Sequence, residues 1–140
     1  MQKLNEEKIY RLIDANFNRT KEGLRVCEDV ARFIFDHTSV TRKYKILRHA
    51  IEKIFGKLLL PKQRVIKSRN VRGDVGKKSL GEEFRRESPK DIFYANSQRA
   101  KESVRVLEEF VKLVDVRLAE ELKKIRYELY ALEKTIVKKF

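Results

Sequence analysis

Apolar side chains recur at spacings of three and four residues along four stretches of the chain, which is the spacing of an amphipathic helix. A long break after the second stretch separates two pairs, and within each pair the connecting turn is short. A turn this short joins antiparallel helices. The pattern therefore predicts two helical hairpins, with helices at about residues 5–35, 40–60, 89–114 and 116–138.

Capping and helix-breaking residues mark the expected ends of these helices. Asn5, which precedes two glutamates, is a suitable N-cap for the first helix, and Pro61 ends the second. Ser88 followed by Pro89 supplies an N-cap and the residue favoured at the first helical position. Asp115 is the expected N-cap of the fourth helix. The end signals thus agree with the apolar pattern.

The two hairpins share polar side chains as well as apolar ones. Both carry A-N-x-x-R-x-K-E-x-x-R-V-x-E-[DE] without a gap, eighty positions apart. Selection for an amphipathic helix leaves exposed polar identities loose, so the repeat indicates that particular polar groups serve a purpose at two related places. The duplicated groups include Asn16 and Asn96, Arg19 and Arg99, Glu22 and Glu102 and, farther along each hairpin, Arg48 and Arg126.

On a helical wheel Asn16 and Asn96 fall near the middle of the apolar stripes, while Arg19 and Arg99 lie roughly 80° to one flank. A buried amide needs a hydrogen-bond partner, since leaving it unpaired costs roughly 1–3 kcal/mol. The Asn pair therefore either closes a core network that fixes helix register or binds a ligand. The spacing of Glu22, Arg25, Glu28 and Asp29, three or four residues apart, also suits ordinary surface ion pairs, although their recurrence in the second copy weighs against that interpretation.

These observations predict an all-α fold in which duplicated helical hairpins, related by a pseudo-twofold axis, form a four-helix bundle with a long basic crossover loop. The 140 residues make one domain by length, with hairpin 1 at about 5–60, the crossover at about 61–88 and hairpin 2 at about 89–138. Bundles build ligand sites from side chains on facing helices. We therefore expect the duplicated Asn and Arg side chains, including Arg48 and Arg126, to face a cleft between the two halves.

Positive charge is concentrated in the crossover. Of the net charge of +13, residues 56–90 contribute +7, with 11 basic and 4 acidic side chains. Arg72, Gly73, Asp74, Gly76 and Lys77 offer exposed amides and cations that suit a phosphate, and Asp74 is a candidate Mg²⁺ ligand. The same residues also suit a solvated turn. The crossover shows no sustained helical period, apart from a short helix expected at 80–86.

Composition excludes several classes of protein. The sequence has no signal peptide and no apolar run long enough to span a bilayer, so we expect a soluble, cytoplasmic protein without a membrane partner. Cys27 falls on the apolar stripe as a core residue, and His37 and His49 have no partner at metal-ligand spacing. A transition-metal site is therefore not expected.

The doubled motif, the central R-G-D-V-G at 72–76 and R-Y-E-L-Y-A-L-E at 126–133 resemble a known family, from about Tyr10 to Glu133. That family is the helical domain found alone or fused ahead of thiamine-phosphate synthase in some bacteria and archaea, described as an alternative hydroxymethylpyrimidine-phosphate kinase. The resemblance implies transfer of the γ-phosphoryl group of ATP to 4-amino-5-hydroxymethyl-2-methylpyrimidine phosphate. The product would be the pyrophosphate that thiamine-phosphate synthase consumes. The sequence ends at Phe140, so no fused synthase domain is expected.

The resemblance supplies no catalytic residues, so their roles are hypotheses about the repeated positions. Phosphoryl transfer from ATP with Mg²⁺ needs positioning and charge neutralisation more than covalent chemistry. The expected roles are phosphate clamps at Arg19, Arg99, Arg48 and Arg126, a closing loop at Arg72, Gly73, Gly76 and Lys77, Mg²⁺ ligands at Asp74 with Glu22 or Glu102, and pyrimidine contacts at Asn16 or Asn96.

Three other classes of function share some of these features. A non-catalytic module would bind a phosphorylated pyrimidine or nucleotide without turnover. A nucleic-acid-binding protein fits poorly, because the excess charge lies in one segment and no DNA- or RNA-reading motif occurs. The Lys-rich surface argues against a bundle that serves only as an assembly partner, although Tyr127, Tyr130 and Phe140 are candidates for a homodimer contact.

Overall fold

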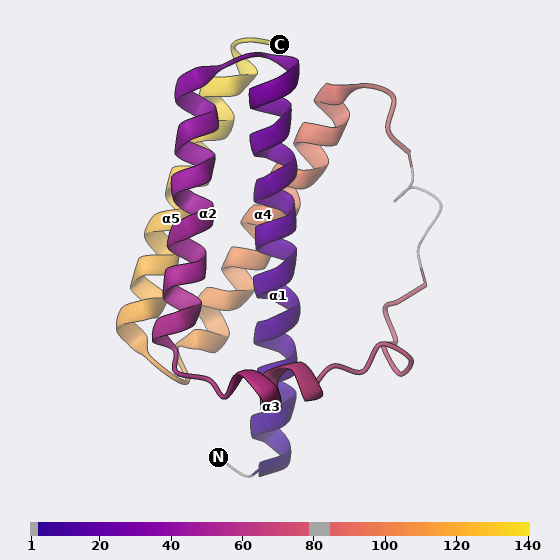
Figure 1. Ribbon diagram of the computed structural model, residues 1–140, viewed down its shortest axis with the longest axis vertical. Coiled ribbons are helices and arrows are strands. Elements are labelled where there is room, and N and C mark those ends of the chain that lie inside the picture. Colours follow the sequence, from indigo (N-terminus) through magenta and orange to yellow (C-terminus); the bar gives the residue numbers. More distant parts are fainter. Residues whose placement is uncertain (1–2, 79–84) are drawn as a thin grey trace.

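The chain is helical throughout the parts that the structure describes. A computed structural model describes residues 3–78 and 85–140 (Figure 1). No strand occurs in these two segments, so the predicted all-α class is confirmed. In chain order the elements are α1 (Lys3–Asp29), the π-helix η1 (Val30–Ile34), α2 (Thr38–Lys57), α3 (Lys62–Lys67), α4 (Pro89–Val111) and α5 (Val116–Val137).

The two predicted hairpins are present, α1 with α2 and α4 with α5 (Figure 1). The caps of the second hairpin are as predicted, because Ser88 Oγ accepts a hydrogen bond from the amide of Asp91 and the Asp115 carboxylate accepts from two amides of α5. The prediction for Asn5 is wrong, since α1 already begins at Lys3. The N-cap predictions were therefore correct for both helices of the second hairpin and wrong for the first helix of the chain.

α1 and α4 cross in antiparallel directions at small side chains. Thr20 Oγ1 and Ser103 Oγ form a buried hydrogen bond of 2.7 Å across the crossing. Beside it Gly23 faces Ala100, and a Cβ atom on Gly23 would lie 2.9 Å from the carbonyl oxygen of Asn96. Thr20 corresponds to Ala100 in the repeat and Gly23 to Ser103, so the pseudo-twofold axis relates the two contacts.

α2 and α5 cover one side of the α1–α4 pair, and the crossover runs past the other side (Figure 1). Apolar side chains of all four long helices meet in one core, in agreement with the predicted bundle. None of the helices in the described part of the chain is both long and apolar enough to cross a membrane. The core includes Ile13, Leu24, Leu47, Ile51, Val104, Leu107, Leu122 and Leu129.

Three residues that were predicted to lie in the core or in a homodimer contact can be placed directly. Cys27 is fully buried, and burial, with the nearby charge of Glu133, raises the pKa of its thiol to about 12. The thiol therefore stays protonated and unreactive at neutral pH. Phe140 packs with its ring centroid 5.4 Å from that of Phe93, so it belongs to this chain's own core edge, whereas Tyr127 is exposed.

The crossover begins with a helix that the apolar pattern did not predict. α3 buries Val65 and packs against α1, and just beyond it Arg69 donates from Nε and Nη2 to the Asp14 carboxylate at 2.7 and 2.9 Å. Six residues are too few to show a helical period, so the helix depends on these tertiary contacts. The short helix expected at 80–86 falls mostly on residues 79–84, which lie outside the described residues.

The turn of the first hairpin departs from ideal helical geometry. α1 runs into the π-helix η1, and Asp36 has a left-handed backbone with φ of 47°. The wider π turn rotates the chain, so the apolar side chain of Ile34 is 54% exposed. In the second hairpin α4 ends at Val111, earlier than expected, which leaves Val114 41% exposed.

The close crossing predicts opposite effects for the same substitution at two helical glycines. Gly23→Ala should lower the free energy of unfolding by about 1–3 kcal/mol, because the added Cβ meets backbone at the α1–α4 contact. Gly56→Ala should raise it by about 0.5–1 kcal/mol, because nothing lies within 4 Å of that position in α2. Urea denaturation measures both; equal effects would show that α1 and α4 do not touch at Gly23.

Candidate functional site

The groove between α1 and α4 contains a cavity of about 570 Å³, which we call the inter-hairpin pocket. Both halves of the repeat line it, together with two residues from the described part of the crossover. The predicted convergence of the duplicated Asn and Arg side chains is thus observed for two of the three pairs. The lining residues are Asn16 and Arg19 from α1, Ala95, Asn96, Gln98, Arg99, Glu102, Ser103 and Val106 from α4, and Gly76 and Arg86 from the crossover.

The two asparagines are each held by their own helix. Asn16 Nδ2 donates to the carbonyl of Leu12 at 2.9 Å, and Asn96 Nδ2 donates to that of Ile92 at 2.8 Å. Asn16 Oδ1 also accepts from Arg19 Nη1 at 3.4 Å. Each amide keeps a second N–H, so the pair is fixed in direction yet able to contact a ligand.

Arg19 and Arg99 differ from the other cations of the repeated motif because neither forms an ion pair with a described carboxylate. An exposed arginine that lies beside a cavity and lacks an ion-pair partner favours an anionic ligand. The other cations of the motif, together with Arg48 and Arg126, are paired: Lys21 with Glu52, Lys101 with Glu133, Arg25 and Arg48 with Glu28, and Arg105 and Arg126 with Glu108.

Arg48 and Arg126 do not line the inter-hairpin pocket, contrary to our expectation. Arg48 Nη2 lies 3.4 Å from both carboxylate oxygens of Glu28, and Arg126 Nε donates to Glu108, which raises the pKa of Arg126. Glu28 does form the ion pair with Arg25 that its spacing allows, but it is not a surface pair on the Glu28 side, since Glu28 is only 3% exposed. Both arginines face back toward α1 and α4 within their own hairpins, where a buried carboxylate requires a counter-charge.

The two glutamates of the repeat lie in different surroundings. Glu102 lines the inter-hairpin pocket, and its Oε1 accepts from Gln98 Nε2 at 2.9 Å. Glu22 instead lines a depression between α1 and α2, beside Arg25 and Arg48. The repeat therefore does not bring these two carboxylates together.

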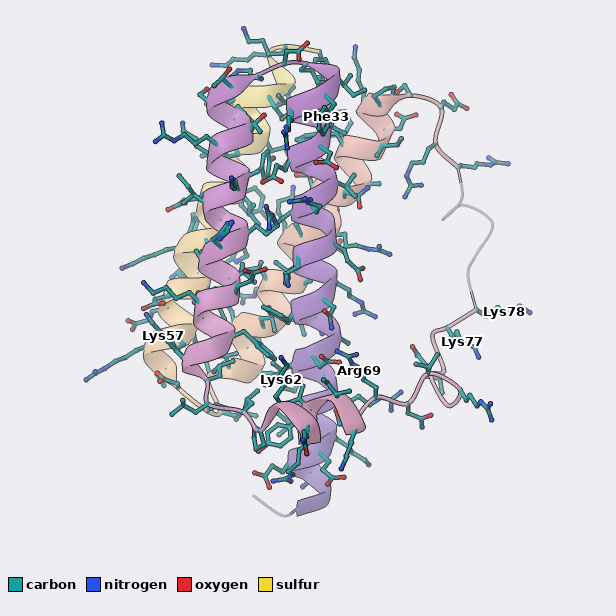
Figure 2. All side chains as sticks on the ribbon, in the orientation of Figure 1. Phe33, Lys57, Lys62, Arg69, Lys77 and Lys78 are labelled. Atoms are coloured by element: carbon teal, nitrogen blue, oxygen red, sulfur yellow. The ribbon has the colours of Figure 1, made fainter. Side chains whose placement is uncertain are left out.

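The glycine-rich loop contributes less than its composition suggested. The amide of Gly73 donates to Asn70 Oδ1 at 2.8 Å, and the amide of Gly76 donates to Asp74 Oδ1 at 2.9 Å. We expected both amides to be available to a phosphate, but both form hydrogen bonds within the loop. Only Gly76 of this loop lines the pocket. Arg72, Asp74 and Lys77 are exposed, and Figure 2 shows Lys77 on the outer part of the crossover, away from α1.

Sequence reasoning missed the contacts that position the crossover. The hydrogen bonds of Arg69 to Asp14 fix the start of the crossover on α1. The repeat gives no signal for this contact, because the position equivalent to Asp14 in the second hairpin is Tyr94. Gln98 also lines the pocket, although its equivalent in the first copy of the repeat is Asn18, a different residue. Arg86, near the end of the crossover, lines the pocket as well. The tertiary fold, not the motif, brings these groups to the site.

These features define a helical-bundle protein with an arginine-lined pocket between two repeated hairpins. Residues 11–135 match the family model described as the ThiD2 family, and the chain belongs to that family. No solved structure matches the chain.

Curated relatives carry the name thiamine-phosphate synthase. The one from Nostoc punctiforme (strain ATCC 29133 / PCC 73102) is 34% identical over 133 residues, which make up 94% of this chain and 36% of the relative. The one from Synechococcus sp. (strain CC9605) is 37% identical and covers 93% of this chain and 36% of the relative. The one from Prochlorococcus marinus (strain AS9601) is 39% identical, with 90% and 34% covered. The chain thus spans about a third of the length of these relatives.

Because Glu28 and Glu108 are buried, replacing one of them by an uncharged residue of the same size should destabilise the fold strongly. Glu108→Gln should lower the free energy of unfolding by roughly 3 kcal/mol, because it leaves Arg126 without its counter-charge in a largely buried place. Glu109→Gln, at the neighbouring exposed position, should change it little. Chemical denaturation compares the two. If Glu108→Gln/Arg126→Met were less stable than Glu108→Gln alone, the unpaired-charge explanation would be wrong.

Proposed function

We propose that the chain is a kinase of thiamine biosynthesis that transfers the γ-phosphoryl group of ATP to 4-amino-5-hydroxymethyl-2-methylpyrimidine phosphate. The observation that carries the proposal is the meeting of Arg19 and Arg99 in one pocket, each without a carboxylate partner among the described residues. Membership of the ThiD2 family and the relatives named thiamine-phosphate synthase support the pathway. Such a synthase would consume the product, which makes it the expected functional partner.

The reaction joins two anions, so charge neutralisation is its main requirement. An oxygen of the acceptor phosphate forms a bond to the γ-phosphorus, the bond to the bridging oxygen breaks, and ADP leaves with that electron pair. The attacking oxygen is already ionised at neutral pH, so no strong general base is needed. Arg19 and Arg99, from opposite hairpins, would each hold a phosphate group by paired hydrogen bonds and reduce the repulsion between donor and acceptor.

The amides of the pocket suit the aminopyrimidine ring. An amide donates and accepts at once, as does the edge formed by a ring nitrogen and an amino group. Asn96 is half-buried, and its Oδ1 has no hydrogen-bond partner among the described residues, so it can accept from the amino group. Ser103 and Val106 line the same cavity and supply a small polar group and an apolar surface.

The carboxylates of Glu102 and Asp74 suit a Mg²⁺ ion that binds together with the substrate phosphates, rather than one coordinated by protein groups alone. Mg²⁺ commonly takes one or two carboxylates and completes its shell with water and phosphate oxygens. Glu102 lines the pocket, and Asp74 bonds the amide of Gly76, which also lines it. Residues 3–78 and 85–140 contain no group of three or more His, Cys, Asp or Glu that could hold a metal alone. The ion would supply further neutralisation of the β- and γ-phosphates.

The duplicated arginines provide the test of the proposed activity. Purified protein with ATP, Mg²⁺ and the pyrimidine monophosphate should form the pyrophosphate and ADP, followed by ³¹P NMR. Arg19→Ala and Arg99→Ala should each lower kcat/KM about a hundredfold or more, because each removes a charge-stabilising contact to the transferred group. Melting temperature should stay unchanged, since both side chains are exposed and make no ion pair among the described residues.

Arg117→Ala is the matched control, because Arg117 is an exposed arginine on α5 that lines none of the described cavities. It should keep full activity. Full activity in both Arg19→Ala and Arg99→Ala would refute the assignment of the pocket. Binding of the pyrimidine monophosphate by the native chain without ADP formation would instead identify a non-catalytic binding module.

A further inference from the structure

A second, larger cavity lies at the turn of the first hairpin. It has a volume of about 670 Å³ and is bounded by the end of α1, η1 and the first half of α2. Figure 2 labels Phe33 near this turn, at the end of the bundle opposite the N-terminus. It shares no lining residue with the inter-hairpin pocket. We call it the hairpin-turn cavity.

The hairpin-turn cavity carries an excess of positive charge. Arg25, Arg32, Arg42, Lys45 and Arg48 line it, against the carboxylates of Glu28 and Asp36. Two of these arginines share Glu28, as described above. The other three cations are exposed and make no ion pair within the described residues. Their mutual repulsion is unfavourable unless an anion offsets it.

Four of the five cations in this cluster have basic counterparts in the second hairpin, whereas Arg42 does not. The counterpart of Arg42 in the second hairpin is Glu120, seventy-eight positions later, which reverses the charge. The first turn is also two residues longer than the second. The second hairpin therefore has an acid in place of one cation of the cluster, and its turn is shorter.

Local geometry also distinguishes this turn. Asp36 adopts a left-handed backbone, and η1 is a π-helical turn, two uncommon features that concentrate at functional sites. Arg48 Nε is buried and has no hydrogen-bond partner, whereas Nε of its counterpart Arg126 donates to Glu108. The first hairpin thus keeps donor capacity that the second one uses internally.

We propose that the hairpin-turn cavity binds an oligophosphate anion, either a free di- or triphosphate or the phosphate chain of a nucleotide. Five cations against two carboxylates leave three positive charges, which a di- or triphosphate balances better than a single phosphate does. The exposed Arg42 and Lys45 would contact the outer phosphate, with Arg32, whose guanidinium lies 4.7 Å from the Phe33 ring, beside them. This site is separate from the inter-hairpin pocket and is independent of the kinase proposal.

Titration calorimetry with sodium tripolyphosphate at physiological ionic strength tests this inference. Arg42→Gln/Lys45→Gln should weaken binding about tenfold or more, because each cation contributes a charge-assisted hydrogen bond. Arg117→Gln/Lys123→Gln removes the same charge from α5, where Lys123 is the repeat counterpart of Lys45, and should change the affinity less than about twofold. Because the inter-hairpin pocket is itself proposed to bind phosphates, Arg19→Ala/Arg99→Ala should remove any binding there and leave the binding at the hairpin-turn cavity.

Three outcomes would overturn the inference. Equal loss in the two glutamine double variants would indicate diffuse surface charge and an adventitious ion only. Loss confined to Arg19→Ala/Arg99→Ala would place the anion in the inter-hairpin pocket. No heat of binding with the native chain would exclude the site altogether. A parallel titration with ATP separates the two sources: tighter binding than tripolyphosphate, lost in Arg42→Gln/Lys45→Gln, identifies a nucleotide.

Discussion

The close antiparallel approach of α1 and α4 is the constraint on which the rest of the structure depends. Gly23 and Ala100 on one side, and Thr20 with Ser103 on the other, leave so little side chain at the crossing that the helices meet almost backbone to backbone. Because the crossing lies on the pseudo-twofold axis, side chains at equivalent repeat positions emerge around the same groove. Arg19 and Arg99 reach one cavity for this reason, although eighty residues separate them in the chain.

The structure separates the duplicated charges into two kinds. Those facing α2 or α5 are neutralised inside a hairpin, where Glu28 and Glu108 are buried and each takes two arginines. Burial of such pairs requires a counter-charge more than it adds stability, so they fix the geometry of each hairpin. Arg19 and Arg99, on the open side of the crossing, form no ion pair with a described carboxylate. A ligand that is itself an anion is the natural complement to this arrangement.

The repeat and the apolar spacing were enough to predict the helical class, the two hairpins, the caps at Ser88 and Asp115 and the convergence of Asn16 with Asn96. They could not decide what Arg48 faces, because a wheel gives direction relative to one stripe and not the identity of the neighbouring helix. α3 was missed because six residues show no period, and η1 because a π turn leaves no composition signal. Contacts such as Asp14 with Arg69 join distant segments and appear only in the fold.

A crystal structure with the pyrimidine monophosphate and a non-hydrolysable ATP analogue would test the central claim most directly. The account predicts that phosphate groups lie in the inter-hairpin pocket and accept hydrogen bonds from both Arg19 and Arg99, one from each half of the repeat. Ligands bound elsewhere on the bundle, with the two guanidinium groups turned to solvent, would contradict it.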